Sequence, residues 1–291
     1  MLELTLNELT KKYGKKTVVG GVSYTLRHGI YGLLGANGAG KTTLLRMICG
    51  ILESSGGNVL CNGCTIKTMG AEYRRILGYL PQNFGYYPGF SAKRFLMYFA
   101  ALKALPKQEA ETKVEELLRL VGLEGEKNRK IRTFSGGMVR RLGIAQALLN
   151  DPKILILDEP TAGLDPKERI RFRNIISSLS KDRVIILSTH IVSDVEYIAD
   201  EILLMRGGQL IVSGDIDTML STVRGKVWEC CVRPEETEKY QAEYSVSNLR
   251  NTEKGIKLRI VADICPVDGA CPADPDLEDV YLYYFREKGR E

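Results

Sequence analysis

The sequence predicts an α/β protein with a parallel β-sheet at its centre, followed by a smaller α+β unit. Short apolar runs alternate with longer segments of helical periodicity, which is typical of buried parallel strands connected by helices. These runs occupy residues 30–34, 154–157 and 184–187. Towards the end of the chain, strand-like segments at 227–232 and 256–261 enclose a polar helical stretch, and a helix is expected at 277–285. We therefore expect a large domain at residues 1–217 and a small accessory domain at 218–291.

The composition indicates a globular protein of a reducing compartment. With 291 residues, of which 44% are hydrophobic and 26% charged, the chain can bury a substantial core. The net charge of +5 is spread along the sequence, so we expect no nucleic acid partner. The longest apolar run, Phe95–Leu102, has 8 residues, whereas a membrane-spanning helix needs roughly 18. The chain starts without a secretory pattern, and its 7 cysteines, an odd number, fit a cytosolic protein.

Helical periodicity replaces the strand pattern between the first two apolar runs. Phe95, Phe99 and Leu102 share one helical face, and a second apolar face follows at 114–121. We expect a helical insertion at about residues 90–150.

Cys61 and Cys64 form a CxxC motif for which two interpretations are open. Asn62 and Gly63 between them are a strong signal for a two-residue β-hairpin turn. A zinc site would need further ligands, but the sequence has no second CxxC motif and only 2 histidines. We therefore favour the hairpin.

A glycine-rich loop directly follows the apolar run at 30–34. Residues 35–42 read Gly-Ala-Asn-Gly-Ala-Gly-Lys-Thr, the pattern of a phosphate-binding loop, and a helix is expected after them. Glycines let backbone amides point at phosphate oxygens, and the helix N-terminus adds positive potential. We expect Lys41 to contact the β- and γ-phosphates of a nucleotide and Thr42 to hold Mg²⁺. The predicted nucleotide-binding residues of this loop are Gly35, Asn37, Gly38, Ala39, Gly40, Lys41, Thr42 and Thr43.

Two adjacent carboxylates end the apolar run at 154–157. Asp158 and Glu159 would share the carboxyl edge of the sheet with the phosphate loop, because ligands bind at that edge in α/β proteins. We expect Asp158 to bind magnesium and Glu159 to polarise the water that attacks the γ-phosphate.

A second anion site is expected about twenty residues before these acids, where residues 134–138 read Phe-Ser-Gly-Gly-Met. A serine hydroxyl and glycine amides at the start of a helix attract an anion. The stretch resembles the signature of ABC ATPases, usually Leu-Ser-Gly-Gly-Gln. Phe134 and Met138 depart from it, whereas Ser135, Gly136 and Gly137 are retained. With the phosphate loop and the acids, the resemblance covers about residues 1–214.

The resemblance implies a P-loop NTPase core of the ABC ATPase type, with an antiparallel β subdomain and an α-helical insertion, and a small C-terminal α+β appendage. It implies ATP and Mg²⁺ as cofactors. It also implies a head-to-tail pair of ATPase subunits, identical or different, in which each ATP lies between the phosphate loop of one subunit and Ser135, Gly136 and Gly137 of the other.

Four further residues receive roles from the resemblance. Tyr13 falls where the family places a ring against adenine, and Gln82 where a glutamine contacts magnesium or the attacking water. Asp165 falls in the loop that crosses the dimer interface, and His190 where a histidine contacts the γ-phosphate. By residue type alone, Tyr13 could instead pack at a strand end and Gln82 could be an ordinary loop residue.

The implied partner is an integral membrane permease, with the chain attached to it at the cytoplasmic face of the membrane. Four aromatic residues at 84–90 either form a docking surface for it or seal the base of the insertion. Residues 277–282 resemble the tails of exporter ATPases, so an exporter is expected. The alternatives are a soluble ABC ATPase of the DNA repair or translation type, and a permease-bound regulator that scarcely hydrolyses ATP; Glu159 argues against the regulator.

Overall fold

The computed structural model describes residues 2–253 and 255–286, which fall into two units, Met1–Ile211 and Val212–Glu291. The units divide within β10 (Gln209–Gly214), a few residues before the boundary expected from the sequence. The first unit contains two β-sheets and the second unit one, and each unit has its own apolar core.

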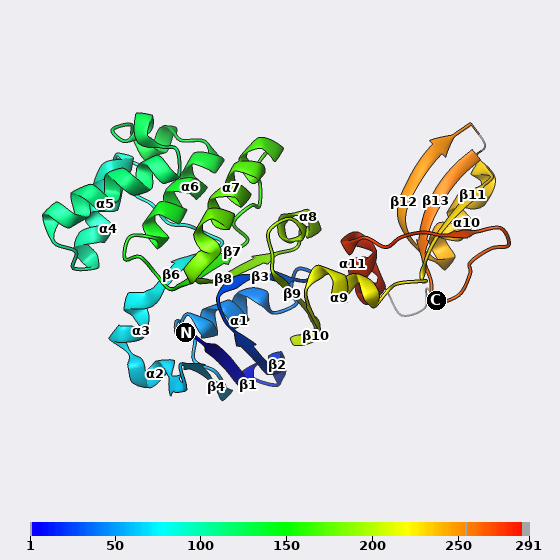
Figure 1. Cartoon of the computed structure of the whole chain (residues 1–291), viewed down its shortest axis with the longest axis horizontal. Helices are drawn as coiled ribbons and strands as arrows, with labels where there is room; N and C mark the ends of the chain where they lie inside the picture. The colour runs from blue at the N-terminus through cyan, green and yellow to red at the C-terminus, as the bar shows by residue number, and fades with distance from the viewer. Residues whose placement is uncertain (1, 254, 287–291) are drawn as a thin grey trace. The chain divides into compact units, whose positions relative to one another are not determined.

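A six-stranded sheet forms the centre of the first unit (Figure 1), with the strand order β10-β9-β3-β8-β7-β6. Its other strands are β3 (Gly29–Leu34), β6 (Leu77–Leu80), β7 (Ile154–Asp158), β8 (Val184–Thr189) and β9 (Glu201–Arg206). These five pair in parallel, and every residue of β3, β7 and β8 is buried. The three apolar runs are therefore strands buried on both faces, as predicted.

A second, antiparallel sheet of the first unit has the order β2-β1-β4-β5. Its strands are β1 (Leu4–Tyr13), β2 (Lys16–Leu26), β4 (Gly56–Cys61) and β5 (Cys64–Thr65). Cys61 pairs with Cys64 across the hairpin, and Asn62 and Gly63 have φ values of 50° and 80°. Two consecutive left-handed residues are what a tight hairpin turn requires, so the hairpin interpretation is confirmed.

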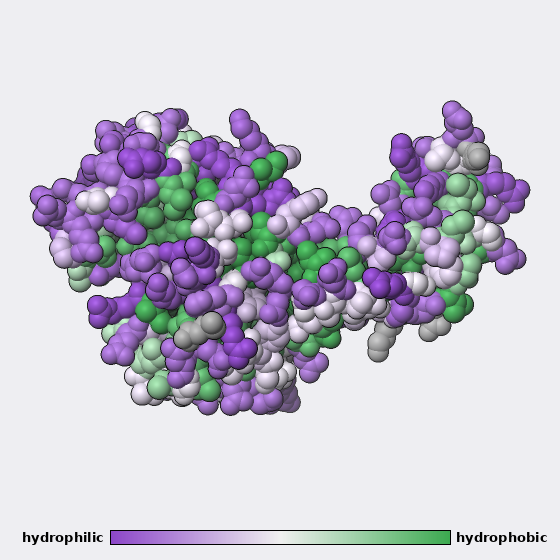
Figure 2. Space-filling view, in the orientation of Figure 1, coloured by the Kyte–Doolittle hydropathy of each residue, from purple (hydrophilic) through white to green (hydrophobic). Residues whose placement is uncertain are grey.

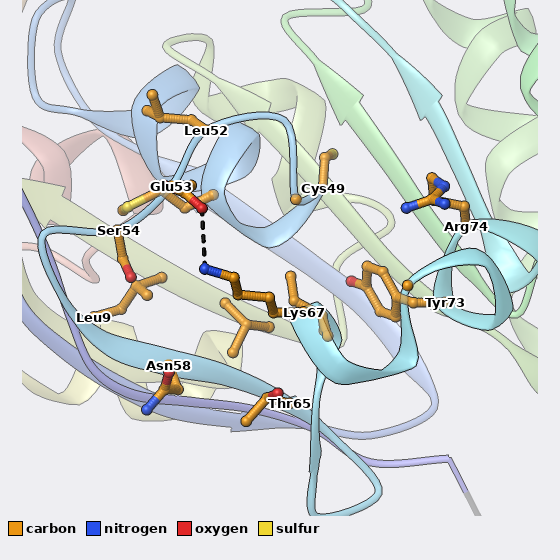
Figure 3. A pocket seen from close by; sticks show the side chains of 15 residues that line it. Leu9, Cys49, Leu52, Glu53, Ser54, Asn58, Thr65, Lys67, Tyr73 and Arg74 are labelled. Carbon is orange, nitrogen blue, oxygen red and sulfur yellow. Dashed lines mark hydrogen bonds and ion pairs between the residues drawn. The ribbon is translucent and has the colours of Figure 1, made fainter.

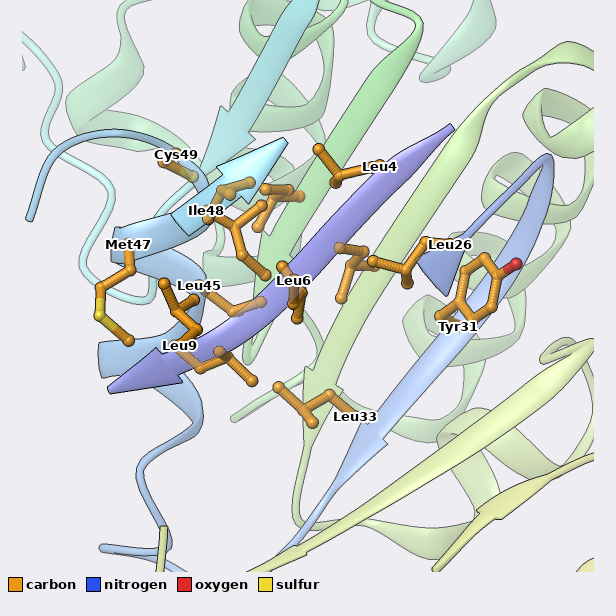
Figure 4. Close-up of a cluster of buried hydrophobic side chains, with 14 of the residues drawn as sticks. Leu4, Leu6, Leu9, Leu26, Tyr31, Leu33, Leu45, Met47, Ile48 and Cys49 are labelled. Atoms are coloured by element: carbon orange, nitrogen blue, oxygen red, sulfur yellow. The ribbon is translucent and has the colours of Figure 1, made fainter. Parts of the chain in front are cut away.

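The main apolar core lies where this antiparallel sheet meets α1 (Lys41–Ile48) and the central sheet (Figure 4). Leu4 and Leu6 alternate along β1, and Leu9 points to the same inward side because the strand pairing is irregular between Leu6 and Leu9. All three lie against Leu45 and Ile48 of α1. Because strand side chains alternate between faces, one face of β1 is apolar and the other is polar. This packing holds the phosphate loop, which precedes α1, against the edge of the central sheet.

The helices of the first unit fall into two groups, of which α4 to α7 lie on the side of the central sheet opposite α1 (Figure 1). The remaining α-helices of this unit are α2 (Ile66–Met69), α3 (Ala71–Ile76), α4 (Ala92–Leu102), α5 (Lys107–Leu120), α6 (Gly136–Ala147), α7 (Pro166–Leu179) and α8 (Val192–Glu196). Short 3₁₀ turns occur at Glu124–Glu126, Ile131–Thr133 and Ser180–Asp182. Hydrophilic side chains cover much of the surface over α4 and α5 in Figure 2. Within the described residues, no helix combines the length and the apolar character needed to span a bilayer.

The C-terminal unit contains a four-stranded antiparallel sheet in the order β12-β13-β11-β14. Its strands are β11 (Val227–Val232), β12 (Ser245–Thr252), β13 (Gly255–Val261) and β14 (Cys271–Pro272). Its helices are α9 (Ile216–Ser221), α10 (Thr237–Glu243) and α11 (Leu277–Phe285), with a 3₁₀ turn at Pro234–Glu236. Arg259 of β13 pairs at 2.7 Å with Asp279 of α11, a fully buried carboxylate, which fixes the helix to the sheet.

Candidate nucleotide site

The phosphate loop turns sharply between β3 and α1 and borders a cavity of about 320 Å³. Gly40 has a φ of 106°, and a Cβ there would lie 2.6 Å from the carbonyl oxygen of Val18. A Cβ at Gly35 would lie 2.4 Å from the carbonyl oxygen of Met205. Only glycine fits at these two positions, so the loop sequence follows from the close approach of the backbone. The cavity is lined by Val18, residues 36–43, Gln82 and Glu159.

Lys41 lies inside this cavity, with only 6% of its surface exposed. Its Nζ donates hydrogen bonds to the carbonyl oxygens of Gly35 at 2.6 Å and Ala36 at 3.3 Å. It also lies 3.3 Å from Oε1 of Glu159. A buried ammonium needs such partners, and here the loop and Glu159 provide them.

Asp158 ends β7 and is completely buried. Its Oδ1 accepts hydrogen bonds from the hydroxyls of Thr42 at 3.1 Å and Ser188 at 2.7 Å. Its Oδ2 is buried and has no hydrogen-bond partner among the described residues. An orphaned carboxylate oxygen beside a threonine hydroxyl suits a hard cation that prefers oxygen ligands, so these residues fit Mg²⁺.

Glu159 lies between the side chains of Lys41 and His190. Its Oε1 faces Lys41 and its Oε2 lies 2.8 Å from Nδ1 of His190. Only 6% of the Glu159 side chain is exposed, whereas 41% of the His190 side chain is exposed. The structure thus joins the predicted base and the predicted γ-phosphate ligand directly.

The backbone at Glu159 has a φ of 47°, a left-handed conformation that costs roughly 1–3 kcal/mol for a residue with a side chain. The Glu159 amide donates to the hydroxyl of Ser188 at 3.0 Å and to the carbonyl of Ser188 at 3.1 Å. Below it, the buried carboxylate of Asp194 accepts hydrogen bonds from Thr161 and Thr189. These contacts hold the turn after β7 against the end of β8.

Ser188 and Asp194 are site residues for which the sequence analysis gave no role. Ser188 lies at the carboxyl end of β8, which is adjacent to β7, and this position at the ligand-binding edge of the sheet could have identified it as a site residue. Asp194 offered no signal of its own, because its partners come from two other segments.

The predicted signature residues and Asp165 lie outside the phosphate cavity of this chain. Ser135 caps α6 by accepting a hydrogen bond from the Met138 amide at 3.2 Å. Asp165 caps α7 in the same way, through the Glu168 amide at 2.9 Å. Both residues are ordinary helix caps at exposed positions, so the N-termini of α6 and α7 lie at the surface of this chain.

Gln82 connects the phosphate cavity to a second cavity of about 500 Å³. This second cavity lies between the loop after β6, the start of α6 and the loop before α7, and Gln82, Phe134 and Arg140 are among its lining residues. Arg140 reaches the carbonyl of Pro81 at 3.4 Å. Gln82 therefore lies between the phosphate loop and the segment that carries Ser135.

Tyr13 is 52% exposed at the end of β1 and does not line the phosphate cavity. The ammonium of Lys11 lies 5.3 Å from the centre of its ring. Its role against adenine stays a prediction.

The aromatic loop after Gln82 divides into two kinds of residue. Phe84 is half-buried and meets the buried ring of Phe95 edge-on, with 5.7 Å between the ring centres. Tyr86 and Tyr87 are 39% and 47% exposed. Phe84 therefore seals the base of the helical insertion. Tyr87 also packs against Phe90, Phe95 and Tyr98, but both tyrosines keep exposed surface for a partner.

A further cavity of about 360 Å³ lies between the C-terminal end of α1, β4 and α3 (Figure 3). Its lining includes Cys49 and Tyr73, and an exposed ion pair of 3.2 Å joins Glu53 to Lys67 beside it. None of the predicted nucleotide residues lines it. The cavity is therefore separate from the nucleotide site.

Comparison with known proteins agrees with this geometry. A family model described as ABC transporter matches residues 19–162. The linearmycin resistance ATP-binding protein LnrL of Bacillus subtilis is 37% identical over 224 residues, which are 76% of this chain and 72% of that protein. The chain belongs to the ABC transporter family. It is an ATPase and an ATP-binding subunit of the kind that serves these transporters.

Other members of the ABC transporter family give the same result. The Nod factor export ATP-binding protein I of Burkholderia lata is 36% identical over 213 residues, 72% of this chain and 70% of that protein. A solved structure described as an ATP-binding subunit of an ABC transporter superposes with a TM-score of 0.68 at 29% identity. It covers 75% of this chain and 92% of the solved chain. The predicted P-loop NTPase fold of the ABC ATPase type is confirmed.

Proposed function

We propose that this ABC ATPase binds ATP with Mg²⁺ at the phosphate loop and hydrolyses it with Glu159 as general base. The observation that carries the proposal is the position of Glu159 between Lys41 and His190, at 3.3 Å and 2.8 Å. When bound at Asp158 and Thr42, Mg²⁺ would neutralise charge on the phosphates.

The contacts of Glu159 suggest how the site changes when ATP binds. Lys41 reaches the β- and γ-phosphates, so its ion pair with Glu159 is weakened. The freed carboxylate oxygen then accepts a proton from the attacking water, while Nδ1 of His190 keeps the other oxygen oriented. For His190 to donate this hydrogen bond, Nδ1 carries the proton, and Nε2 is then an acceptor or, in the charged form, a second donor.

We further propose that two subunits pair head to tail, with Ser135, Gly136 and Gly137 of one completing the ATP site of the other. The support is that these residues form the N-terminus of α6, which can bind an anion but does not line the phosphate cavity of its own chain. Asp165 would lie at the same interface. ATP binding energy would close the pair, and hydrolysis would allow it to reopen.

The partner we propose is an integral membrane permease at the cytoplasmic face of the membrane, and the transport direction is export. The related protein from Burkholderia lata is named for Nod factor export, which supports this direction. Tyr86 and Tyr87, exposed beside Gln82, are the proposed contact with the permease.

Substitution of Glu159 by Gln tests the catalytic assignment. General bases contribute about a hundredfold to ten-thousandfold, so we expect steady-state phosphate release to fall at least about a hundredfold while ATP still binds. Glu109→Gln, at an exposed position of α5, is the matched control and should keep wild-type turnover. Wild-type turnover in Glu159→Gln would remove Glu159 from this role.

A further inference from the structure

Tyr79 of β6 carries a buried hydroxyl that the sequence analysis did not use. The hydroxyl oxygen has no hydrogen-bond partner among the described residues. A buried polar group without a partner destabilises the folded chain, so such a group in a native site needs an explanation.

The sheet register places Tyr79 beside Asp158. Tyr79 pairs with Ile156 of the adjacent parallel strand β7, and Asp158 follows two residues later. Side chains two apart on a strand share a face, so Tyr79 and Asp158 are diagonal neighbours on the face that packs against α1. Asp158 confirms this orientation by its hydrogen bond with Thr42 of α1.

One face of α1 lies beside both the Tyr79 hydroxyl and the Asp158 carboxylate. Thr42, Arg46 and Cys49 are spaced by four and three residues, so they form one helical stripe. Thr42 contacts Asp158, whereas Arg46 and Cys49 lie near the Tyr79 hydroxyl. The guanidinium of Arg46 approaches the Tyr79 hydroxyl without hydrogen-bond geometry and opposes the rise of its pKa. Because a guanidinium can only donate, the proton of the hydroxyl has no acceptor among the described residues.

Tyr79 can only act as a neutral group here. Burial, with smaller contributions from Cys49 and Asp158, raises the pKa of Tyr79 to about 12. The phenol therefore keeps its proton at neutral pH and is available as a hydrogen-bond donor. Oδ2 of Asp158, which also lacks a partner, is an acceptor.

We propose that Tyr79 is a positioning residue for the metal: its hydroxyl donates a hydrogen bond through one water molecule to Oδ2 of Asp158. A single water that bridges the two would give the Tyr79 hydroxyl an acceptor and would use one lone pair of Oδ2, which leaves the other lone pair of this oxygen for Mg²⁺. The bridge holds the carboxylate in the orientation that Mg²⁺ requires. This inference rests on the proposed role of Asp158 in binding Mg²⁺.

The test is the Mg²⁺ dependence of ATP binding in a Glu159→Gln background, where hydrolysis does not consume the nucleotide. Outer hydrogen bonds to metal ligands affect metal affinity, and one water-mediated bond corresponds to roughly a fivefold effect. In Tyr79→Phe we expect the Mg²⁺ concentration for half-maximal ATP binding, measured by calorimetric titration, to rise roughly fivefold, with ATP affinity in EDTA unchanged.

Tyr73→Phe is the matched control. Tyr73 is also buried beside Cys49, but its hydroxyl donates to the carbonyl of Ile48 at 2.8 Å, at the C-terminal end of α1, whereas the phosphate loop precedes the N-terminal end. It should lose thermal stability and keep the wild-type Mg²⁺ requirement. The melting temperature of Tyr79→Phe should not exceed that of the parent protein, because in this proposal a water already accepts the hydrogen bond of the hydroxyl.

An unchanged Mg²⁺ requirement in Tyr79→Phe would overturn the inference, and so would a raised melting temperature, which would mean that the hydroxyl is truly unpaired. Asp158→Asn tests the proposed metal site separately from the role of Tyr79. In this variant ATP binding should no longer depend on Mg²⁺. If Asp158→Asn keeps this dependence, the proposed metal site is wrong and the role of Tyr79 is withdrawn with it.

Discussion

Replacement of Ser188 by Ala would remove the hydroxyl that joins the carboxylate of Asp158 to the backbone amide of Glu159. Ser188 is fully buried, donates to Oδ1 of Asp158 at 2.7 Å and accepts from the amide of Glu159 at 3.0 Å. A hydrogen bond to a charged group contributes about 1.5–3 kcal/mol. The Glu159 amide keeps its bond to the Ser188 carbonyl at 3.1 Å, so the loss on that side is small. We expect the free energy of unfolding of the first unit to fall by about 2 kcal/mol.

Urea unfolding followed by far-ultraviolet circular dichroism measures this loss. Trp228, the single tryptophan of the chain, lies in the C-terminal unit, so its fluorescence reports that unit separately. Turnover should also fall, by roughly tenfold or less, because Asp158 keeps its bond to Thr42. Ser178→Ala, on the exposed side of α7, is the control and should change stability by less than about 0.5 kcal/mol. Wild-type stability together with wild-type turnover in Ser188→Ala would refute the idea that this hydroxyl holds the Asp158 carboxylate and the backbone of Glu159 in place.

Two other substitutions test separate parts of the proposal. Lys41→Ala removes the buried ammonium of the phosphate loop, and we expect ATP affinity in a nucleotide titration to fall by about a hundredfold or more; retained micromolar affinity would contradict the assignment. Tyr86→Ala should loosen attachment to the permease in a co-purification from gently solubilised membranes, with the turnover of the isolated chain unchanged. Phe84→Ala should instead lower stability by about 2–4 kcal/mol, because Phe84 packs on Phe95. Loss of turnover in Tyr86→Ala would assign that ring to the core as well.

The fold could largely be predicted from the sequence because burial leaves a periodic signature. The apolar run at 184–187 became β8 (Val184–Thr189), and the strand and helix expected at 227–232 and 277–285 have those bounds. The phosphate-loop helix was expected from residue 43 but begins at Lys41, because the loop closes directly onto the helix at Gly40. Helix starts depend on one residue's backbone conformation, which periodicity does not report.

A contact within the site could be predicted only where both of its residues belong to recognisable sequence motifs. The proximity of Asp158 to Thr42 was expected from two strand ends at one sheet edge. The pairing of Glu159 with Lys41 and the buried carboxylate of Asp194 were not, because each joins segments that are remote in sequence. The split between Phe84 and Tyr86 in the aromatic loop likewise depends on packing against α4, which residue type alone does not specify.

The most direct test of the account is the mass of the Glu159→Gln variant in solution, measured by light scattering with ATP and Mg²⁺ and again with ADP. We predict twice the chain mass of 32.5 kDa with ATP and the single-chain mass with ADP. In the proposed pair, the γ-phosphate is the group that would join the phosphate loop of one subunit to Ser135 of the other. A single-chain mass at saturating ATP would contradict the head-to-tail site.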